Sequence, residues 1–386
     1  MAKRRFSAEP HIPKYQRIIE TLSDEIRTGK YPPGGKLPSE AALGQQFQTS
    51  RITVGRALRE LTARRMIQRV AGSGSYVQAH RSAAEGLVFG LLIPDLGRAE
   101  VFTPICQGIA NAPSAAPHVL LWGQAASDGA SAGEQALGLC AQYIGKRIDG
   151  VFFAPLETGA AAEEANLSIL AQLDRARIPV TLLDRDVLPY PRQSRHDLVG
   201  IDNRRAALLA TEHLLKLGAQ RVSFVAQTGG ASTIGARIAG FREALLSSGH
   251  GWENRLAQGR IIRLATISEA NLVPLLGGTR RGDGFVCVND RTAGCLMRAL
   301  LALGYRIPRD VRIAGIDDVE YASLLPVPLT TVHQPCREIG EAAMSAMLDR
   351  IARPNMLPRE IRVECWLVIR ESCGARLESE RQAVIA

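Results

Sequence analysis

Arg51, Thr53 and Arg56 form a first group of side chains whose types and spacing could do chemistry. They follow Ser50, whose hydroxyl can accept a hydrogen bond from a free backbone N–H and so begin a helix. Guanidinium groups donate hydrogen bonds to guanine edges and to phosphate oxygens, and hydroxyl groups can bind either. The spacing therefore predicts a helix whose first turns carry donors that suit DNA.

The residues around this group predict the elements that must position it. Ser39 can cap a preceding short helix. The second helix has an apolar stripe at i, i+3, i+4 and i+7, made of Val54, Ala57, Leu58 and Leu61. Two expected strands, residues 67–70 and 75–77, are joined by Gly72-Ser73-Gly74. This order predicts a winged helix-turn-helix, which sets its second helix into the major groove; a helical hairpin with a solvated basic face is the alternative.

The positive charge of the chain is concentrated near its N-terminus. The chain has 386 residues, which allows two or three domains, and its net charge is +9. Residues 1–82 carry 15 Lys and Arg against 6 Asp and Glu, whereas the remainder carries 32 against 32. We therefore expect a polyanion as the partner of the first segment. A membrane surface is not expected, because no amphipathic basic helix with exposed aromatic residues is present.

The pattern changes from Leu87 onward, where apolar runs of strand length alternate with segments of helix length. The runs form two series, at residues 87–93, 119–122, 150–154 and 179–183, and at residues 221–226, 261–264, 284–288 and 311–316. Continuous apolar strands between helices predict parallel sheets that are covered on both faces. The expected fold class is α/β, with a winged helix-turn-helix followed by a two-lobed, doubly wound domain.

Polar residues follow these strands at their carboxyl ends, where open α/β sheets bind ligands. The set comprises Asp95, Asp184, Arg185, Asn289, Asp290, Asp317, Asp318 and Gln334. Each residue taken alone is better explained as a helix cap or a turn residue than as a ligand contact. Together, however, carboxylates can accept from hydroxyl pairs and a guanidinium can donate to ring and hydroxyl oxygens. We therefore expect a pocket for a polyhydroxyl ligand between the two lobes.

Four short motifs occur between residues 15 and 77 at a specific spacing. They are Leu37-Pro38-Ser39-Glu40, Ser50-Arg51-x-Thr53-Val54, Ala57-Leu58-x-x-Leu61 and Gly72-x-Gly74-x-Tyr76-Val77. On these motifs the segment resembles the DNA-binding domain of the GntR family of bacterial transcription regulators. We expect DNA contacts at Ser39, Ser50, Arg51, Thr53, Arg56, Gly72 and Gly74. The family often has arginine where this chain has Ala41 and Gly55, so we expect the operator to be read differently or more weakly.

Further stretches carry a second resemblance. They include Ile178-Pro-Val-Thr-Leu-Leu-Asp-Arg185, Val199-Gly-Ile-Asp-Asn203, Gly235-Ala-Arg-Ile-Ala-Gly-Phe241, Val288-Asn-Asp290, Ala314-Gly-Ile-Asp-Asp318 and Leu329-Thr-Thr-Val-His-Gln334. On them residues 87–374 resemble the effector domain of the LacI/galactose-repressor family, which is itself similar to periplasmic sugar-binding proteins.

This second resemblance implies where a ligand would bind. It places sugar contacts at Asp184, Arg185, Arg237, Asn289, Asp317 and Gln334, with Arg237 ranked first. We expect Arg237 and Asp317 to be removable without loss of the fold, because each should line a pocket. The first strand–helix loop departs from the family, which tends to have Asn-Pro-Phe-Phe where this chain has Gly97-Arg-Ala-Glu-Val-Phe102. Arg98 and Phe102 remain candidate lining residues.

A GntR-type domain joined to a LacI-type domain resembles the arabinose-repressor branch. The resemblance implies a DNA-binding domain at 1–77, a linker at 78–86, an effector and dimerisation domain at 87–374 and a tail at 375–386. It also implies a cytoplasmic homodimer that binds a palindromic operator in double-stranded DNA, responds to a small-molecule effector such as a sugar, and represses transcription. An activator, or a non-sugar effector such as a nucleobase, is the alternative.

Enzymes and transport receptors are the rival classes. The chain has no Gly-x-Ser-x-Gly, Walker loop or His-Glu-x-x-His motif, so we expect no catalytic residues and no cofactor. Its seven cysteines include no Cys-x-x-Cys pair, which predicts a reducing compartment without a disulfide framework or a metal site. A transport receptor would need a signal peptide, and none is expected here; nor is a membrane partner.

Overall fold

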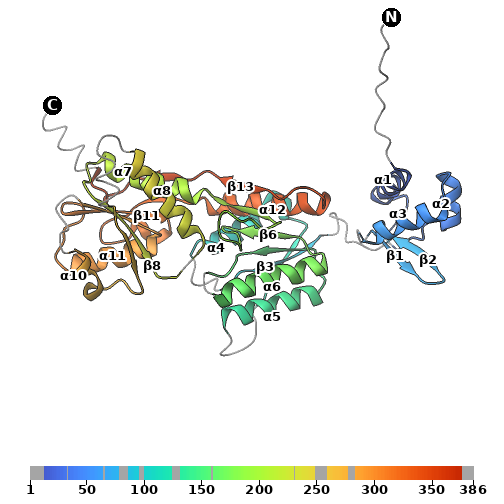
Figure 1. Ribbon diagram of the computed structural model, residues 1–386, viewed down its shortest axis with the longest axis horizontal. Helices are drawn as coiled ribbons and strands as arrows, with labels where there is room; N and C mark the ends of the chain where they lie inside the picture. The colour runs from blue at the N-terminus through green and yellow to red at the C-terminus, as the bar shows by residue number, and fades with distance from the viewer. Residues whose placement is uncertain are drawn as a thin grey trace, which may run out of the picture. The chain divides into compact units, whose positions relative to one another are not determined.

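The chain folds into two compact units that divide after Gly86. The computed structural model describes residues 13–32, 34–63, 66–77, 86–94, 100–123, 131–157, 160–229, 231–247, 259–276 and 283–375. Figure 1 shows a smaller helical unit with one hairpin, called the head below, and a larger α/β unit, called the sensor. The expected linker at 78–86 and tail at 375–386 lie outside the described ranges, except for Gly86 and Ala375.

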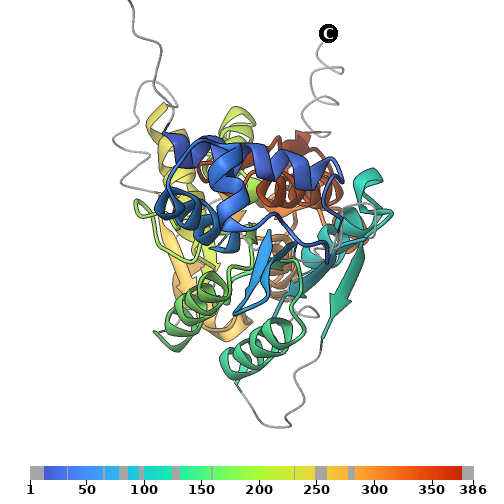
Figure 2. The same ribbon diagram turned by 90° about the vertical axis from the view of Figure 1, so that its right-hand side faces the viewer.

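The described part of the head contains three helices and a two-stranded antiparallel sheet. Its elements are α1 (Lys14–Arg27), α2 (Glu40–Gln46), α3 (Arg51–Ala63), β1 (Ile67–Val70) and β2 (Gly74–Val77). The expected stripe of α3 is buried in the apolar core of the head together with residues of α1 and the hairpin. The hairpin lies to one side of the three helices (Figures 1 and 2). This arrangement is the predicted winged helix-turn-helix.

Two serine side chains start the second and third helices. Ser39 Oγ accepts a hydrogen bond from the backbone nitrogen of Ala42 at 3.2 Å. Ser50 Oγ accepts one from the backbone nitrogen of Thr53 at 3.3 Å. Each bond satisfies an N–H that the first helical turn would otherwise leave unpaired, so the predicted capping residues set where α2 and α3 begin.

The hairpin of the head differs from the prediction by one residue. The sequence predicts Gly72-Ser73-Gly74 as the turn, whereas Gly74 already pairs with Val70 as the first residue of β2. Gly72 and Gly74 have φ angles of 74° and 132°, which glycine adopts at little cost because it lacks a Cβ. The segment before α2 extends the hairpin, since the backbone nitrogen of Leu37 donates to the oxygen of Ser75 at 2.8 Å.

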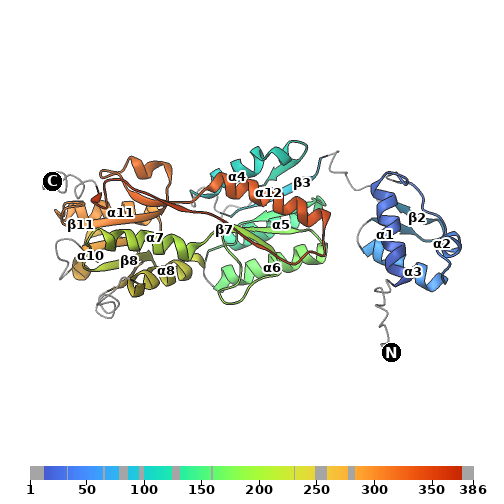
Figure 3. The same cartoon turned by 90° about the horizontal axis from the view of Figure 1, so that it is seen from above.

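The first lobe of the sensor is built on a six-stranded parallel sheet. In spatial order its strands are β13 (Glu360–Val363), β7 (Asp197–Ile201), β6 (Val180–Leu183), β5 (Gly150–Phe153), β3 (Val88–Leu92) and β4 (Val119–Trp122). The covering helices are α4 (Phe102–Asn111), α5 (Ala132–Gly145), α6 (Ala160–Ala176) and α12 (Cys336–Ala352). Helices α5 and α6 lie side by side on one face, and α4 and α12 lie on the other (Figure 3). Phe152 packs toward α4 and α12, whereas Val151 and Phe153 pack toward α5 and α6.

The second lobe repeats this plan with one exception. In spatial order its strands are β14 (Trp366–Val368), β12 (Thr330–His333), β11 (Val311–Asp317), β10 (Asp283–Cys287), β8 (Val222–Gln227) and β9 (Ile261–Leu264). Its helices are α7 (Asn203–Lys216), α8 (Thr233–Ser247), α10 (Glu269–Leu276) and α11 (Asp290–Ala302). The prediction of an all-parallel sheet is wrong at one edge of this lobe, because β14 runs antiparallel to β12. The two predicted strand series also omit β7, β12, β13 and β14.

The chain passes between the two lobes three times. Strand β7 leads to α7, β12 leads through Gln334 to α12, and β13 leads through Cys365 to β14. One apolar cluster continues through both lobes and contains Leu183 of β6 and Val332 of β12. The crossings therefore place polar residues such as Gln334 beside the strand ends of both sheets.

Helices α4 and α12 are in backbone contact. A Cβ at Gly108 of α4 would lie 2.1 Å from the backbone oxygen of Arg337, and one at Gly340 of α12 would lie 2.2 Å from the oxygen of Ile105. Any larger side chain would push the two helices apart. Because α4 begins at Phe102 and α12 follows Gln334 closely, this packing fixes two predicted ligand residues relative to each other.

Candidate functional site

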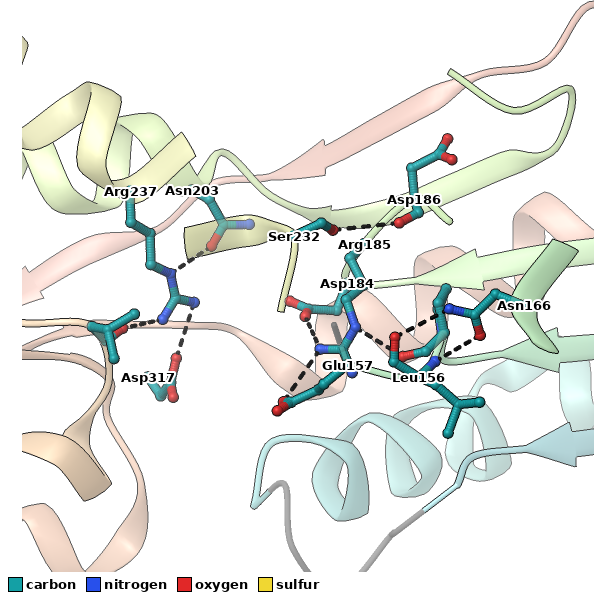
Figure 4. Close-up of polar contacts among 12 residues, drawn as sticks. Leu156, Glu157, Asn166, Asp184, Arg185, Asp186, Asn203, Ser232, Arg237 and Asp317 are labelled. Atoms are coloured by element: carbon teal, nitrogen blue, oxygen red, sulfur yellow. Dashed lines mark hydrogen bonds and ion pairs between the residues drawn. The ribbon is translucent and has the colours of Figure 1, made fainter. Parts of the chain in front are cut away.

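The end of β6 contributes an aspartate and an arginine to the first lobe's half of the site. Asp184 and Arg185 are each 8% exposed. The guanidinium of Arg185 donates to the backbone oxygen of Pro155 at 2.9 Å and to Asp184 Oδ2 at 3.3 Å, and lies 3.9 Å from Glu157 Oε1 (Figure 4). Its Cζ is 5.5 Å from the centre of the Phe102 ring. Arg185 is therefore held between carboxylates and an aromatic ring.

Arg237 organises the second lobe's half. Its side chain is buried, and Nε donates to Asn203 Oδ1 at 2.7 Å (Figure 4). One terminal nitrogen donates to the backbone oxygen of Val288, and the other to Asp317 Oδ1 at 3.3 Å. The arginine that was ranked first for ligand contact is thus bonded to three protein acceptors, which come from the start of α7, the end of β10 and the end of β11.

The two halves meet through residues at the crossings. Gln334 Nε2 donates to Asp184 Oδ1 at 3.3 Å. The side-chain oxygen of Gln334 is buried and has no hydrogen-bond partner in the described part of the chain. Ser232, just before α8, donates to the backbone oxygen of Asp186 in the other lobe at 3.4 Å (Figure 4). Polar groups of both lobes therefore share one region, which includes an acceptor that lacks a donor.

Three aspartates of this region have left-handed backbone conformations. The φ angles are 68° at Asp184, 122° at Asp317 and 56° at Asp318. Non-glycine residues adopt such angles at a cost of about 1–3 kcal/mol each, and they concentrate at functional sites. All three follow a predicted strand, and the family resemblance implied ligand contacts at Asp184 and Asp317.

Carboxyl groups dominate the electrostatics of the site. Burial raises the pKa of Asp317 to about 7; Arg237 opposes this rise, whereas the carboxylates of Asp184 and Glu100 add to it. Burial also raises the pKa of Asp290 well above its ordinary range, and Asp317 raises it further. Such surroundings disfavour an added anion and suit a neutral ligand that donates hydroxyl hydrogen bonds.

Not every residue predicted to contact the ligand is placed in this region by the structure. Asn289 uses its side-chain oxygen to cap α11, where it accepts from the backbone nitrogen of Thr292 at 2.9 Å. Asp95 and Arg98 lie outside the described residues. The prediction missed Asn203 and Glu157, although both follow strand ends, at β7 and β5, and that position was the available signal.

Several predicted DNA contacts gather on one concave surface of the head, with a volume of about 620 Å³. Its lining includes the predicted residues Ser39, Arg51, Gly72 and Gly74. Lys36 and Arg69 line the same surface and were not predicted. Arg69 pairs with Glu40 at 2.5 Å, which ties the hairpin to the start of α2. The surface thus combines three basic side chains with backbone from the hairpin turn.

The other predicted DNA contacts lie on α3. Ser50 Oγ and Thr53 Oγ1 are 3.0 Å apart and share a hydrogen bond. Arg56 places its Cζ 3.9 Å from the centre of the Tyr15 ring of α1, a distance at which cation and ring attract. Arg51 is exposed at the first position of the helix. Helix α3 therefore presents an unobstructed arginine and two braced side chains.

The described ranges contain neither a cluster of metal-binding side chains nor a membrane-spanning helix. Within the ranges that it describes, no group of three His, Cys, Asp or Glu side chains could hold a metal ion. None of the helices described there is both long and apolar enough to span a bilayer. All seven cysteines lie in these ranges as free thiols.

Comparison with known protein families finds one match in the head and one in the sensor. Residues 14–77 match the family of bacterial regulatory proteins named gntR. Residues 211–373 match the periplasmic binding protein-like domain family.

Individual relatives resemble most of the chain. The arabinose metabolism transcriptional repressor of Geobacillus stearothermophilus is 25% identical over 358 residues, which cover 90% of this chain and 94% of that protein. A cellobiose complex of the transcriptional regulator CelR has a TM-score of 0.60 at 24% identity and covers 83% of this chain and 90% of its own. A LacI family transcriptional regulator from Enterococcus faecium with bound ribose has a TM-score of 0.57 at 27% identity and covers 74% and 98%.

Proposed function

We propose that this ligand-responsive transcriptional repressor, which joins a GntR-family helix-turn-helix domain to a periplasmic-binding-protein-like domain, binds operator DNA as a homodimer and releases it when a sugar occupies the sensor. The concave surface of the head and the exposed start of α3 support the DNA partner. A homodimer and a palindromic operator are proposed because a single head offers few base contacts, and two-fold proteins match two-fold sites.

The polar constellation between the two lobes carries the proposal of a sugar effector. Asp184 and Asp317 offer carboxylate acceptors, and Arg185 and Arg237 offer donors. Gln334 adds a buried side-chain oxygen to which no residue of the described ranges donates. A hydroxyl group both donates and accepts, so a polyol can satisfy such a mixed set. The relatives whose names or structures include arabinose, cellobiose and ribose support the same class of ligand.

A neutral sugar fits this site better than a charged one. The described carboxylates include Asp184, Asp317, Glu100 and Glu157, against the guanidiniums of Arg185 and Arg237. A phosphate group on the sugar would add negative charge to this set. We therefore propose an unphosphorylated pentose, hexose or disaccharide. We propose no catalytic role for the described residues of this region, and a DNA target supports the proposal of a cytoplasmic protein.

A ligand screen tests the effector. Purified protein is mixed with neutral sugars, with the phosphate of each sugar and with nucleobases, and thermal unfolding is followed; hits are measured by calorimetry. A ligand that binds only the folded state raises the unfolding temperature by mass action. We expect at least one neutral sugar to do so more strongly than its phosphate. Stabilisation by nucleobases alone, or by a sugar phosphate in preference to its parent sugar, would contradict the proposed ligand.

A further inference from the structure

Ile52 is an apolar side chain in an unusual place. It is 82% exposed, although it lies in the first turn of α3 between Arg51 and Thr53. Val54, Ala57, Leu58 and Leu61 bury the opposite stripe of the helix. At 100° per residue, Ile52 shares the outward face with Arg56 and Arg59, at i+4 and i+7.

An isolated apolar side chain on a protein surface needs no functional explanation by itself. Ile52 differs because the first turn of a recognition helix faces the base edges. The other large apolar side chain exposed in the described part of the head is Val70, at 43%, and it lies on the hairpin. Ile52 is therefore the apolar group that α3 would bring to the floor of the major groove.

The major groove offers one apolar group that the side chain of Ile52 could contact favourably. Base edges in the major groove carry hydrogen-bond donors and acceptors, and the thymine C5 methyl group is the apolar exception. An isoleucine placed over polar edges would bury them without partners, which is unfavourable. Against a methyl group the same side chain removes apolar surface from water.

We propose that Ile52 reads the C5 methyl group of one thymine in each half of the operator. Arg51 supplies polar donors beside it, and the hydroxyl of Thr53 is already held by Ser50. Specificity at this position then comes from a methyl contact and from rejection of bases that lack one. This inference rests on the proposed function, because it requires α3 to enter the major groove.

The test uses the full-length protein and an operator selected from a random-sequence library. Each thymine of the operator is replaced in turn by deoxyuridine, which lacks only the methyl group. We expect one replacement per half-site to weaken wild-type binding about fourfold, the equivalent of one buried methyl group. Ile52→Ala should bind the unmodified operator more weakly and show no difference between thymine and deoxyuridine at that position.

Val70→Ala is the matched control, because it shortens the other exposed apolar side chain of the head. It should keep the wild-type ratio between thymine and deoxyuridine. Equal wild-type affinity for every substituted operator, or an unchanged ratio in Ile52→Ala, would overturn the inference.

The failure of this inference is distinguishable from failure of the proposed function. If Arg51→Ala weakens operator binding while no deoxyuridine substitution does, α3 reads DNA but Ile52 does not. If the library yields no preferred sequence at all, the proposed DNA function fails as well. Thermal unfolding of Ile52→Ala checks its fold, which should be unchanged because Ile52 contributes nothing to the core of the head.

Discussion

The phenol of Tyr321 donates a 2.9 Å hydrogen bond to Glu100, although the two residues are 221 positions apart and belong to different lobes of the sensor. Tyr321 lies in the short 3-10 helix Glu320–Ser323 after β11, and Glu100 precedes α4. Burial, and next the hydrogen bond to Glu100, raise the pKa of Tyr321, so the phenol stays protonated as a donor. The bond requires the lobes to be close together and therefore stabilises their closed arrangement.

Tyr321→Phe should weaken effector binding about two- to tenfold, because the closed arrangement loses one solvent-exposed hydrogen bond. Calorimetry with the sugar found by the screen measures the change. Tyr190→Phe is the control, since Tyr190 is 93% exposed and no bond of its hydroxyl joins the lobes in the described structure. Equal losses in both variants, or no loss in Tyr321→Phe, would show that the bond does not contribute to closure.

Asp317 should make the stability of the sensor depend on pH. Its pKa rises from 3.8 to about 7 on folding, so the folded protein holds this proton more tightly than the unfolded chain does. Wild-type stability should therefore fall as the pH rises from about 4 to about 7. Asp317→Asn cannot ionise and should escape that loss, which is about 1–4 kcal/mol.

Denaturant unfolding of both proteins at several pH values checks this expectation. The free energy of unfolding of Asp317→Asn minus that of the wild type should increase between pH 4 and pH 7, and should change little above that. A difference that is constant, or that decreases with pH, would mean that Asp317 has an ordinary or lowered pKa in the folded protein.

Arg237 should be needed for the fold as well as for the ligand. The sequence predicts that Arg237 lines a pocket and can be removed without loss of the fold. In the structure, however, Arg237 is 6% exposed and donates hydrogen bonds to three protein acceptors. Arg237→Ala should destabilise the protein by about 2–5 kcal/mol, because it leaves buried acceptors and Asp317 without a partner.

Arg242→Ala is the matched control for Arg237→Ala, since Arg242 is an exposed residue of the same helix. It should change stability by less than about 0.5 kcal/mol. Urea unfolding of both variants decides the matter. Similar stabilities for the two would mean that the guanidinium of Arg237 has no structural role.

Arg51→Ala should weaken operator binding by about 1–3 kcal/mol and relax the preference at one base pair per half-site. Arg51 is exposed at the start of α3 and lines the concave surface of the head. Arg298→Ala removes an exposed arginine from α11 of the sensor and should leave binding unchanged. Electrophoretic mobility shifts with the selected operator and its single-base variants measure both. If the two variants bind alike, α3 is not the reading helix.

Local patterns explain why much of the fold was predictable. Each of the correctly predicted features depends on residues that are close together in the sequence. They are the serine caps of α2 and α3, the apolar stripe from Val54 to Leu61, and the apolar strands β5 and β6. Strand β7 was missed because it begins with Asp197, whose charge is balanced by Arg350 at 2.9 Å, 153 residues away. Edge strand β13, Glu360–Val363, alternates charged and apolar residues over four positions, so it lacks the continuous apolar run by which the other strands were predicted.

The candidate site was predictable only in part. Its strand-end position marked Asp184, Asp317 and Gln334 because the ends of parallel strands meet at one sheet edge. The same position left open whether Asn289 binds a ligand or caps α11. It did not tell that Arg237 is bonded to Asn203, because that pairing joins residues far apart in the sequence and no local pattern predicts it.

Reciprocal coupling between effector and operator tests the central claim most directly. If the sugar releases the protein from DNA, operator DNA must weaken sugar binding by the same factor, which is typically about 5- to 150-fold, or about 1–3 kcal/mol. Calorimetry measures sugar affinity with and without saturating operator, and a scrambled duplex serves as the control. We predict that the operator weakens sugar binding and that the scrambled duplex does not. Equal sugar affinities without DNA, with the operator and with the scrambled duplex would contradict a ligand-responsive repressor.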